Sequence, residues 1–116
     1  MKRGEIWLAD LDPVVGSEIG KSRPVVVVST DALNEVVTAR GGGVVTVVPL
    51  TSNVTRIFPF QVFLPSGSAG LRRDSKAMAE QVRCLALRRA RRRVGRLDGV
   101  QLGRLDAALK LHLALD

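Results

Sequence analysis

The 116-residue sequence is poor in residues that cross-link a fold or transfer protons: it has one cysteine, Cys84, and one histidine, His112. A lone cysteine cannot form a disulfide within the chain, so we expect a hydrophobic core to stabilise the fold, with Cys84 as a small buried residue. A lone histidine excludes a nuclease that uses two histidines of one chain as acid and base. We expect His112 to lie in the core or at an interface.

Aromatic residues and long apolar runs are also scarce. The chain has no tyrosine, one tryptophan and three phenylalanines, so it lacks the aromatic-studded sheet on which RNA-recognition domains stack bases. No apolar run approaches the roughly 18 residues needed to cross a bilayer, and residues 1–5 do not form an apolar signal segment. We therefore expect a single domain over residues 1–116, cytoplasmic and without a membrane partner.

Positive charge is in excess, because the formal net charge is +7 and the pI is about 11.0. A block of one charge sign on a small domain favours a polyanionic partner such as nucleic acid. A basic face that is only solvated is the alternative. The block has no acidic residue and comprises Arg83, Arg88, Arg89, Arg91, Arg92, Arg93 and Arg96.

Short apolar stretches separated by glycine, proline and polar turns predict a small β-rich domain. The run that begins at Pro24 is β-branched and nearly continuous, which is typical of a strand buried on both faces. Residues 76–81 fit a helix by composition and a strand by alternation. The pattern predicts strands at residues 3–11, 24–29, 44–50 and 58–64, and one helical turn at 31–35.

The last segment predicts a helix that begins after Asp98, a good N-cap residue. Two apolar stripes follow on roughly opposite sides: Leu102, Leu105, Leu109 and Leu113, and Val100, Ala107, Leu111 and Leu115. A helix that is apolar on two sides is normally buried on both, so we expect one stripe on the parent sheet and the other on a second copy, giving a homodimer. The expected fold class is mainly β (α+β), a small, strongly curved antiparallel barrel with short helices and a C-terminal helix.

Asp10 and Asp12 lie two residues apart at the end of an expected strand, a spacing that suits a metal nuclease. The adjacent Pro13 and the lack of a nearby His or Glu cluster favour a strand-terminating turn instead, with Asp12 capping local N–H groups. Residues 41–43 are glycines, but they lack the lysine and the serine or threonine of a phosphate-binding loop. We expect no metal and no cofactor.

Arg23 precedes a proline, which drives its backbone into an extended conformation before any tertiary contact forms. If residues 24–29 pair antiparallel with 44–50, Arg23 lies beside Thr51. A guanidinium fork and a hydroxyl would then converge on one point, and phosphate is the natural ligand for that arrangement. The alternative is a surface ion pair for Arg23 and a turn cap for Thr51.

At these residues the sequence resembles the MazF/PemK family of toxin endoribonucleases, also called mRNA interferases, of type II toxin–antitoxin systems. The resemblance covers essentially the whole chain. It rests on four stretches in order: RGEIWLADLDP at 3–13, GSE at 16–18 with RPVVV at 23–27, VPLTSN at 48–53, and DS at 74–75 with EQVR at 80–83.

This resemblance implies an SH3-like barrel that forms a homodimer, with RNA in a groove across the interface and a strand near Lys76–Arg83. It implies sequence-specific, metal-independent cleavage of single-stranded RNA that leaves a 2′,3′-cyclic phosphate and a 5′-hydroxyl. Messenger RNA is the expected target, with ribosomal and transfer RNA as further candidates. It also implies two partners: an antitoxin whose acidic C-terminal tail blocks the groove, and operator DNA through the antitoxin complex only.

Carried over by motif, Arg23 and Thr51 match the catalytic pair of the family. Arginine is effectively always protonated, so we assign Arg23 to transition-state stabilisation and proton donation rather than to the role of base. Glu18 is a candidate base, or alternatively a residue that holds Arg23 in place. The residues that match or neighbour the RNA groove are Ser17, Ser52, Asn53, Asp74, Glu80, Gln81 and Arg83.

The arginine run 88–93 is denser than the family motif demands. It would extend the RNA path, bind DNA through an antitoxin complex, or only keep the protein in solution. Two other functions fit part of the sequence: a basic barrel that binds nucleic acid without cutting it, and a gyrase poison on the same fold. The gyrase poison is disfavoured because the C-terminal helix lacks the tryptophan-containing tail of such toxins.

Overall fold

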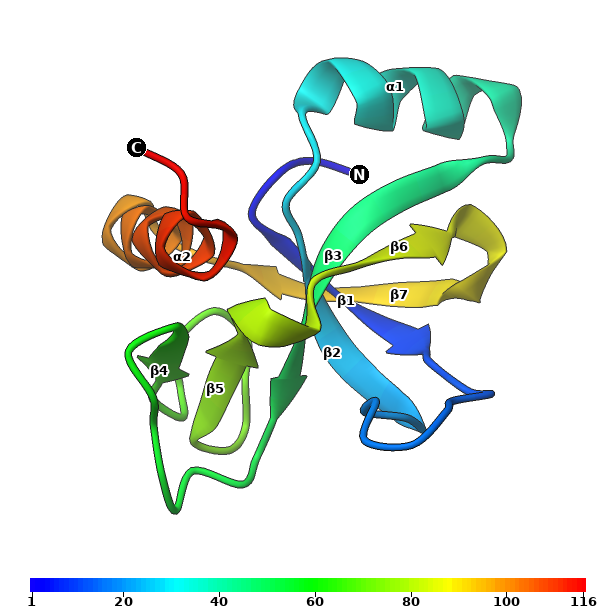
Figure 1. Ribbon diagram of the computed structural model, residues 1–116. Coiled ribbons are helices and arrows are strands. Elements are labelled where there is room, and N and C mark those ends of the chain that lie inside the picture. Colours follow the sequence, from blue (N-terminus) through cyan, green and yellow to red (C-terminus); the bar gives the residue numbers. More distant parts are fainter.

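A computed structural model describes all 116 residues (Figure 1). The strands are β1 (Glu5–Asp10), β2 (Ser22–Val27), β3 (Val44–Thr51), β4 (Gln61–Leu64), β5 (Ser75–Met78), β6 (Arg83–Ala86) and β7 (Ala90–Arg96). The α-helices are α1 (Asp31–Arg40) and α2 (Gly99–Leu113), and the 3-10 turns are η1 (Ala79–Gln81) and η2 (Leu87–Arg89). No helix is long and apolar enough to cross a membrane.

All strand pairs are antiparallel, and the sheet runs in the order β4-β5-β3-β2-β1-β7, with β6 also paired to β3. The long strand β3 pairs through Val44–Val47 with β6 and through Leu50–Thr51 with β5. The predicted mainly β fold with antiparallel strands is confirmed. The expected barrel is not closed by hydrogen bonds, because β4 and β7 end the ladder without pairing to each other.

The valines of β2 lie at the centre of the core and are fully buried on both faces of the strand, as predicted. Val26 belongs to the apolar cluster that includes Leu105 of α2. Val25 and Val27 belong to a second cluster, which includes Val37 of α1. Alternation along one strand therefore joins the two halves of the core, and the strand carrying Arg23 at its start is held from both sides.

Helix α2 begins as predicted: the Asp98 carboxylate accepts from the Gln101 N–H at 2.8 Å, and the Gln101 side chain accepts from the Asp98 N–H at 3.1 Å. This capping box satisfies two backbone donors at the helix start. Leu105 of the first stripe is fully buried, which stabilises the fold by about 1.5–3 kcal/mol. On the second stripe, Val100 is 65% exposed and Leu111 58%, so this face remains open in the monomer.

Two expected strands differ from the structure. The strand expected at 58–64 begins only at Gln61, because the Gln61 side chain accepts from the Phe58 N–H and its backbone N–H donates to the Phe58 carbonyl, forming a turn. The strand expected at Lys76–Arg83 is split into β5, η1 and β6. Both β5 and β6 run antiparallel along β3, and η1 shifts the register between them by three residues, from Lys76↔Thr51 to Arg83↔Val47.

Smaller corrections concern the ends of elements and two side chains. Strand β2 begins two residues before Pro24, because Ser22 and Arg23 pair with the end of β1. The helical turn expected at 31–35 extends to Arg40. Cys84 is exposed rather than buried, since Leu85 is the β6 side chain that enters the core. His112 is also exposed in this single chain, with its ring centroid 6.5 Å from that of Phe60, so it does not lie in the core, and its place at an interface stays a prediction.

Strand β7 contains most of the arginine run and was not predicted as a strand. It pairs with β1 from Glu5↔Arg96 to Ala9↔Ala90. Gly95 of β7 lies against the loop before β5, where a Cβ at Gly95 would approach the Ala69 carbonyl oxygen to 2.1 Å. A Cβ at Gly70 would approach the Val94 carbonyl oxygen to 2.3 Å, so the two backbones touch only because both residues are glycine.

Candidate active site

Arg23 and Thr51 line the same surface hollow, which has a volume of about 530 Å³. The pairing of β2 with β3 runs from Val27↔Val47 to Val25↔Pro49, and continuing this register by two residues sets Arg23 opposite Thr51. The structure thus brings together the two residues that the sequence predicted to converge. Ser52 lines the same hollow.

Arg23 is oriented by its own loop. Its Nε donates to the Gly20 carbonyl oxygen at 2.7 Å, and it forms no ion pair. The two terminal nitrogens of the guanidinium are therefore left for a ligand. Thr51 does cap a turn, because its Oγ1 accepts from the Asn53 N–H at 3.2 Å. A hydroxyl that accepts one hydrogen bond keeps its own proton to donate, so the cap leaves Thr51 a donor for an anion.

The hollow around Arg23 is strongly basic. Fourteen residues line it, and these include four arginines and no carboxylate. Ser22, Thr51, Ser52 and Ser75 add hydroxyl groups. Guanidinium and hydroxyl donors without a competing acid form a site for anions, and phosphate is the anion that an arginine fork binds best.

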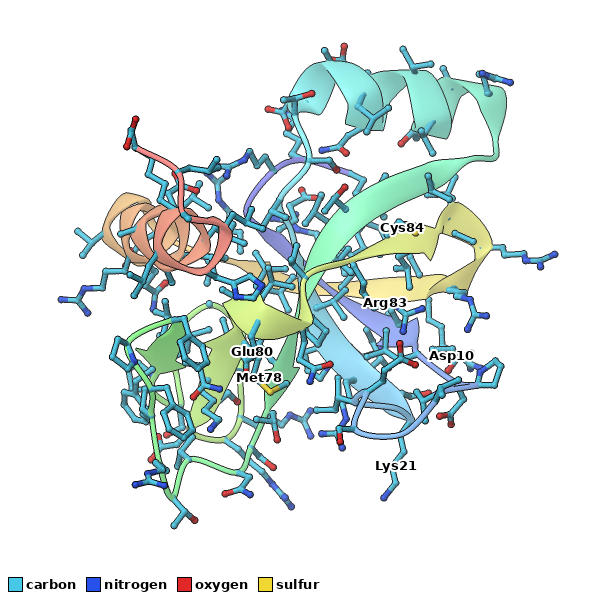
Figure 2. All side chains as sticks on the ribbon, viewed as in Figure 1. Asp10, Lys21, Met78, Glu80, Arg83 and Cys84 are labelled. Atoms are coloured by element: carbon cyan, nitrogen blue, oxygen red, sulfur yellow. The ribbon has the colours of Figure 1, made fainter.

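A second hollow of about 580 Å³ lies next to the β1–β2 loop. It collects the predicted groove residues Ser17, Glu80, Gln81 and Arg83 and the candidate base Glu18, together with Val15, Ile19, Val82 and Cys84. Glu80, Arg83 and Cys84 are labelled in Figure 2, where they follow one another along η1 and β6. Most of the residues predicted to line one groove are thus distributed over two hollows, with Ser17 in the second and Ser52 in the first.

Three side chains of the second hollow hold the β1–β2 loop. Glu18 Oε1 accepts from the Val15 N–H at 2.7 Å, so this carboxylate contacts its own loop and not Arg23. The Gln81 side chain accepts from the Ile19 N–H at 3.3 Å. Arg83 Nη1 donates to the Leu11 carbonyl oxygen at 3.4 Å.

Glu80 of the second hollow contacts β4 and not the loop. Its Oε2 accepts from the Gln61 amide at 2.7 Å, while its Oε1 is buried without a partner.

Two predicted groove residues lie in neither hollow. Asp74 Oδ1 accepts from the Ser66 N–H at 2.9 Å, and Asn53 Oδ1 accepts from the Thr55 N–H at 3.3 Å. Both side chains cap backbone groups within their loops. Each is a chain neighbour of residues that line the first hollow, since Asn53 follows Ser52 and Asp74 lies between Arg73 and Ser75.

Asp10 and Asp12 do not form a metal pair. Asp10 accepts from Arg91 and from the Ser22 hydroxyl, and these two hydrogen bonds lower its pKa below the ordinary value of 3.8. Asp12 Oδ1 accepts from the Lys21 N–H at 2.9 Å, which is the turn-capping role predicted for it. No group of three His, Cys, Asp or Glu residues in the structure could hold a metal ion.

The sequence profile of the family described as "PemK-like, MazF-like toxin of type II toxin-antitoxin system" matches residues 2–113. The chain belongs to this family. It is 53% identical to the endoribonuclease MazF9 of Mycobacterium tuberculosis over 115 residues, which is 99% of this chain and 98% of the relative. It is 34% identical to the endoribonuclease EndoA of Bacillus subtilis over 116 residues, covering 99% and 96% of the two chains.

Solved structures of the family share the fold. Crystalline MazF from Deinococcus radiodurans superimposes with a TM-score of 0.83 at 26% identity, over 99% of this chain and 97% of that one. An endoribonuclease from a mycobacterial species, solved with its cognate antitoxin, gives a TM-score of 0.78 at 22% identity over 100% and 97% of the two chains.

Two arginines of this family member, Arg72 and Arg73, were missed as site residues, and Arg92 was considered only within the run 88–93, for which RNA contact was one of three alternatives. Arg72 and Arg73 precede the family motif that begins at Asp74. Arg92 lies inside the arginine run, and only the pairing of β7 with β1 decides which arginines of the run lie on which face of the sheet. Adjacency to Asp74 was the signal that could have drawn attention to the first two. For Arg92 no local signal exists, because a run of arginines has no period.

Proposed function

We propose that this protein is a sequence-specific, metal-independent endoribonuclease that acts as the toxin of a toxin–antitoxin pair. It cleaves single-stranded RNA, with messenger RNA as its main target. The observation that carries the proposal is the placement of Arg23 and Thr51 in one hollow lined by arginines and free of carboxylates. Relatives at 53% and 34% identity are named endoribonucleases, which supports the same activity.

The reaction follows from what these donors can do. The ribose 2′-oxygen attacks the adjacent phosphorus in line and passes its proton to a water molecule. The bond from phosphorus to the 5′-oxygen breaks, and the leaving oxygen gains a proton. The products are a 2′,3′-cyclic phosphate and a 5′-hydroxyl. The free guanidinium nitrogens of Arg23 and the Thr51 hydroxyl stabilise the charge on the phosphoryl oxygens, and Arg23 donates to the leaving oxygen.

The predicted partners complete the proposal. The second hollow, with Ser17, Glu80, Gln81 and Arg83, continues the RNA groove beyond the scissile bond, and Ser52 contacts RNA within the first. The basic surface binds the acidic C-terminal tail of an antitoxin, which recruits operator DNA to the complex. The exposed stripe of α2 forms a homodimer interface in the cytoplasm.

The test is incubation of purified protein with a long RNA in EDTA, followed by analysis of the ends. Cuts at a recurring short sequence that bear 2′,3′-cyclic phosphates are expected. Arg23→Gln or Thr51→Ala is expected to lower kcat by about 10²–10³-fold, the usual effect of losing one donor to transition-state charge. Arg88→Gln is the matched control, because Arg88 is exposed and lines neither hollow. RNA that is retarded on a gel but intact would instead identify a binding module.

A further inference from the structure

The arginine run divides by the faces of β7. Arg91 donates to Asp10, and Arg93 Nε lies 3.5 Å from Glu5 Oε2, so both arginines pair with acids of β1. Arg89 donates to the backbone carbonyls of Asp10 and Asp12. These three arginines are held by protein groups and fix β7 and the turn before it to β1.

Arg92 lies between the two paired arginines and points the other way. In the ladder it is opposite Leu8, and both residues line the hollow that contains Arg23 and Thr51. Its side chain is exposed and has neither a hydrogen bond nor an ion pair in the structure. A charged head that faces an acid-free hollow without a protein partner is available for an anion.

The loop before β5 adds two more arginines to the same hollow. Arg72 and Arg73 follow Gly70, which packs backbone to backbone on Val94 and Gly95 of β7. Neither side chain forms an ion pair. The contact between the glycines places this loop beside Arg92, so residues from two segments meet around Arg23.

We propose that Arg92, together with Arg72 and Arg73, binds the RNA phosphates that flank the one held by Arg23 and Thr51. This inference rests on the proposed ribonuclease function and names the substrate contacts of the same site. A phosphodiester carries one negative charge, so four guanidinium groups around a single phosphate would leave a large uncompensated charge. An RNA strand with several consecutive phosphates balances the charge of the four guanidinium groups.

The lining favours the RNA backbone over its bases as the ligand. No aromatic residue and no carboxylate lines this hollow, so it offers neither an aromatic ring on which bases stack nor a side-chain carboxylate to accept from base N–H groups. Guanidinium groups bind phosphate oxygens by paired, charge-assisted hydrogen bonds. Arg92 therefore contributes to substrate binding and not to the chemical step.

The experiment compares Arg92→Gln with Arg88→Gln, which removes the same charge from the same run outside the hollow. On a cleavable RNA, Arg92→Gln is expected to raise KM about tenfold with kcat within twofold, whereas Arg88→Gln changes neither. Arg92→Lys is expected to recover part of the loss. Thermal unfolding of each variant verifies that the fold is retained.

Binding is measured separately with a mixed-sequence 2′-O-methyl oligoribonucleotide, which lacks the attacking hydroxyl. The slope of log Kd against log salt is expected to fall by about 0.7 for Arg92→Gln, the value for one phosphate contact on a single strand, and to stay constant for Arg88→Gln. Equal slopes and equal KM values for the two variants would overturn the proposal. Failure of the wild type to cut RNA would overturn the proposed function, and the salt slopes would still decide whether Arg92 binds phosphate.

Discussion

Arg91 and Asp10 join the last strand of the sheet to the first: Nε and Nη2 of Arg91 both donate to Oδ2 of Asp10, at 2.9 and 2.6 Å. The second carboxylate oxygen of Asp10 accepts from the hydroxyl of Ser22, one residue before Arg23. One exposed carboxylate thus links β7, β1 and the start of β2. Arg91 therefore forms an ion pair within the protein, whereas the neighbouring Arg92 faces the hollow that contains Arg23 and Thr51.

Asp10→Asn is expected to lower the unfolding temperature at pH 7. The hydrogen bonds from Arg91 and Ser22 lower the pKa of Asp10 in the folded protein. The stabilisation that Asp10 gives the fold is therefore present above its unfolded pKa near 3.8, and it is lost as the pH falls through the lower folded pKa. The difference from wild type is therefore expected to shrink below pH 3.8. Thermal scans at several pH values measure it, with Asp116→Asn, at the exposed C-terminus, as control. A difference that is constant with pH would contradict the assignment.

Leu105→Ala is expected to destabilise the protein by about 2–5 kcal/mol, because Leu105 is the fully buried leucine on the core-facing side of α2 and its truncation leaves a cavity. Denaturant titration gives the free energy of unfolding. Leu33→Ala in α1, where the side chain is 43% exposed, is the matched control and is expected to change stability by less than about 1 kcal/mol. A similar loss in both variants would show that α2 does not close this core.

Gly95→Ala is expected to destabilise by about 1–3 kcal/mol and to raise KM, because the new Cβ would meet the Ala69 carbonyl oxygen and push away the loop that bears Arg72 and Arg73. Gly103→Ala is a control of opposite sign. A Cβ at this position of α2 meets nothing within 4 Å, so the change is expected to stabilise by about 0.5–1 kcal/mol. Unchanged KM in the Gly95 variant would separate this loop from substrate binding.

Glu18→Gln is expected to retain most of the cleavage activity and the acidic limb of the pH–rate profile. The Glu18 carboxylate accepts from the Val15 N–H and lines the second hollow, and a glutamine oxygen can accept the same hydrogen bond. Glu18→Ala, which frees the loop, is expected to lose more activity. Loss of the acidic limb in the glutamine variant would instead make Glu18 the general base.

Leu111→Glu is expected to convert a homodimer into monomers, because Leu111 lies on the exposed stripe of α2 proposed as the interface. Light scattering across a concentration series measures the mass. Leu33→Glu introduces the same charge on a partly exposed leucine of α1 and is expected to leave the mass unchanged. A dimer that survives the α2 variant would place the interface elsewhere.

Local rules predicted the elements that depend on neighbouring residues. The Asp98 cap, the buried valine run and the position of Arg23 beside Thr51 follow from periodicity, from capping chemistry and from the restriction that Pro24 places on Arg23. The position of Arg23 beside Thr51 depended also on the hypothesis that residues 24–29 pair antiparallel with 44–50, and the register of β2 on β3 confirms that pairing.

Long-range pairing decided what the sequence could not predict. Strand β7 is an arginine-rich segment without an apolar period, and it is a strand because β1 offers it partners and two acids. The split of Lys76–Arg83 depends on the two different registers of β5 and β6 on β3, which η1 separates by three residues. The end of the strand at Gln61 depends on one side chain that folds back on Phe58.

The contact between Gly70 and Gly95 also constrains how such a protein can change over evolution. Each glycine leaves room for the backbone that carries the other. A side chain at either position would push the two backbones apart, and the other position would then no longer need to be glycine. The two positions should therefore covary among relatives, glycine at both where the arginine loop is docked and at neither where it has moved away.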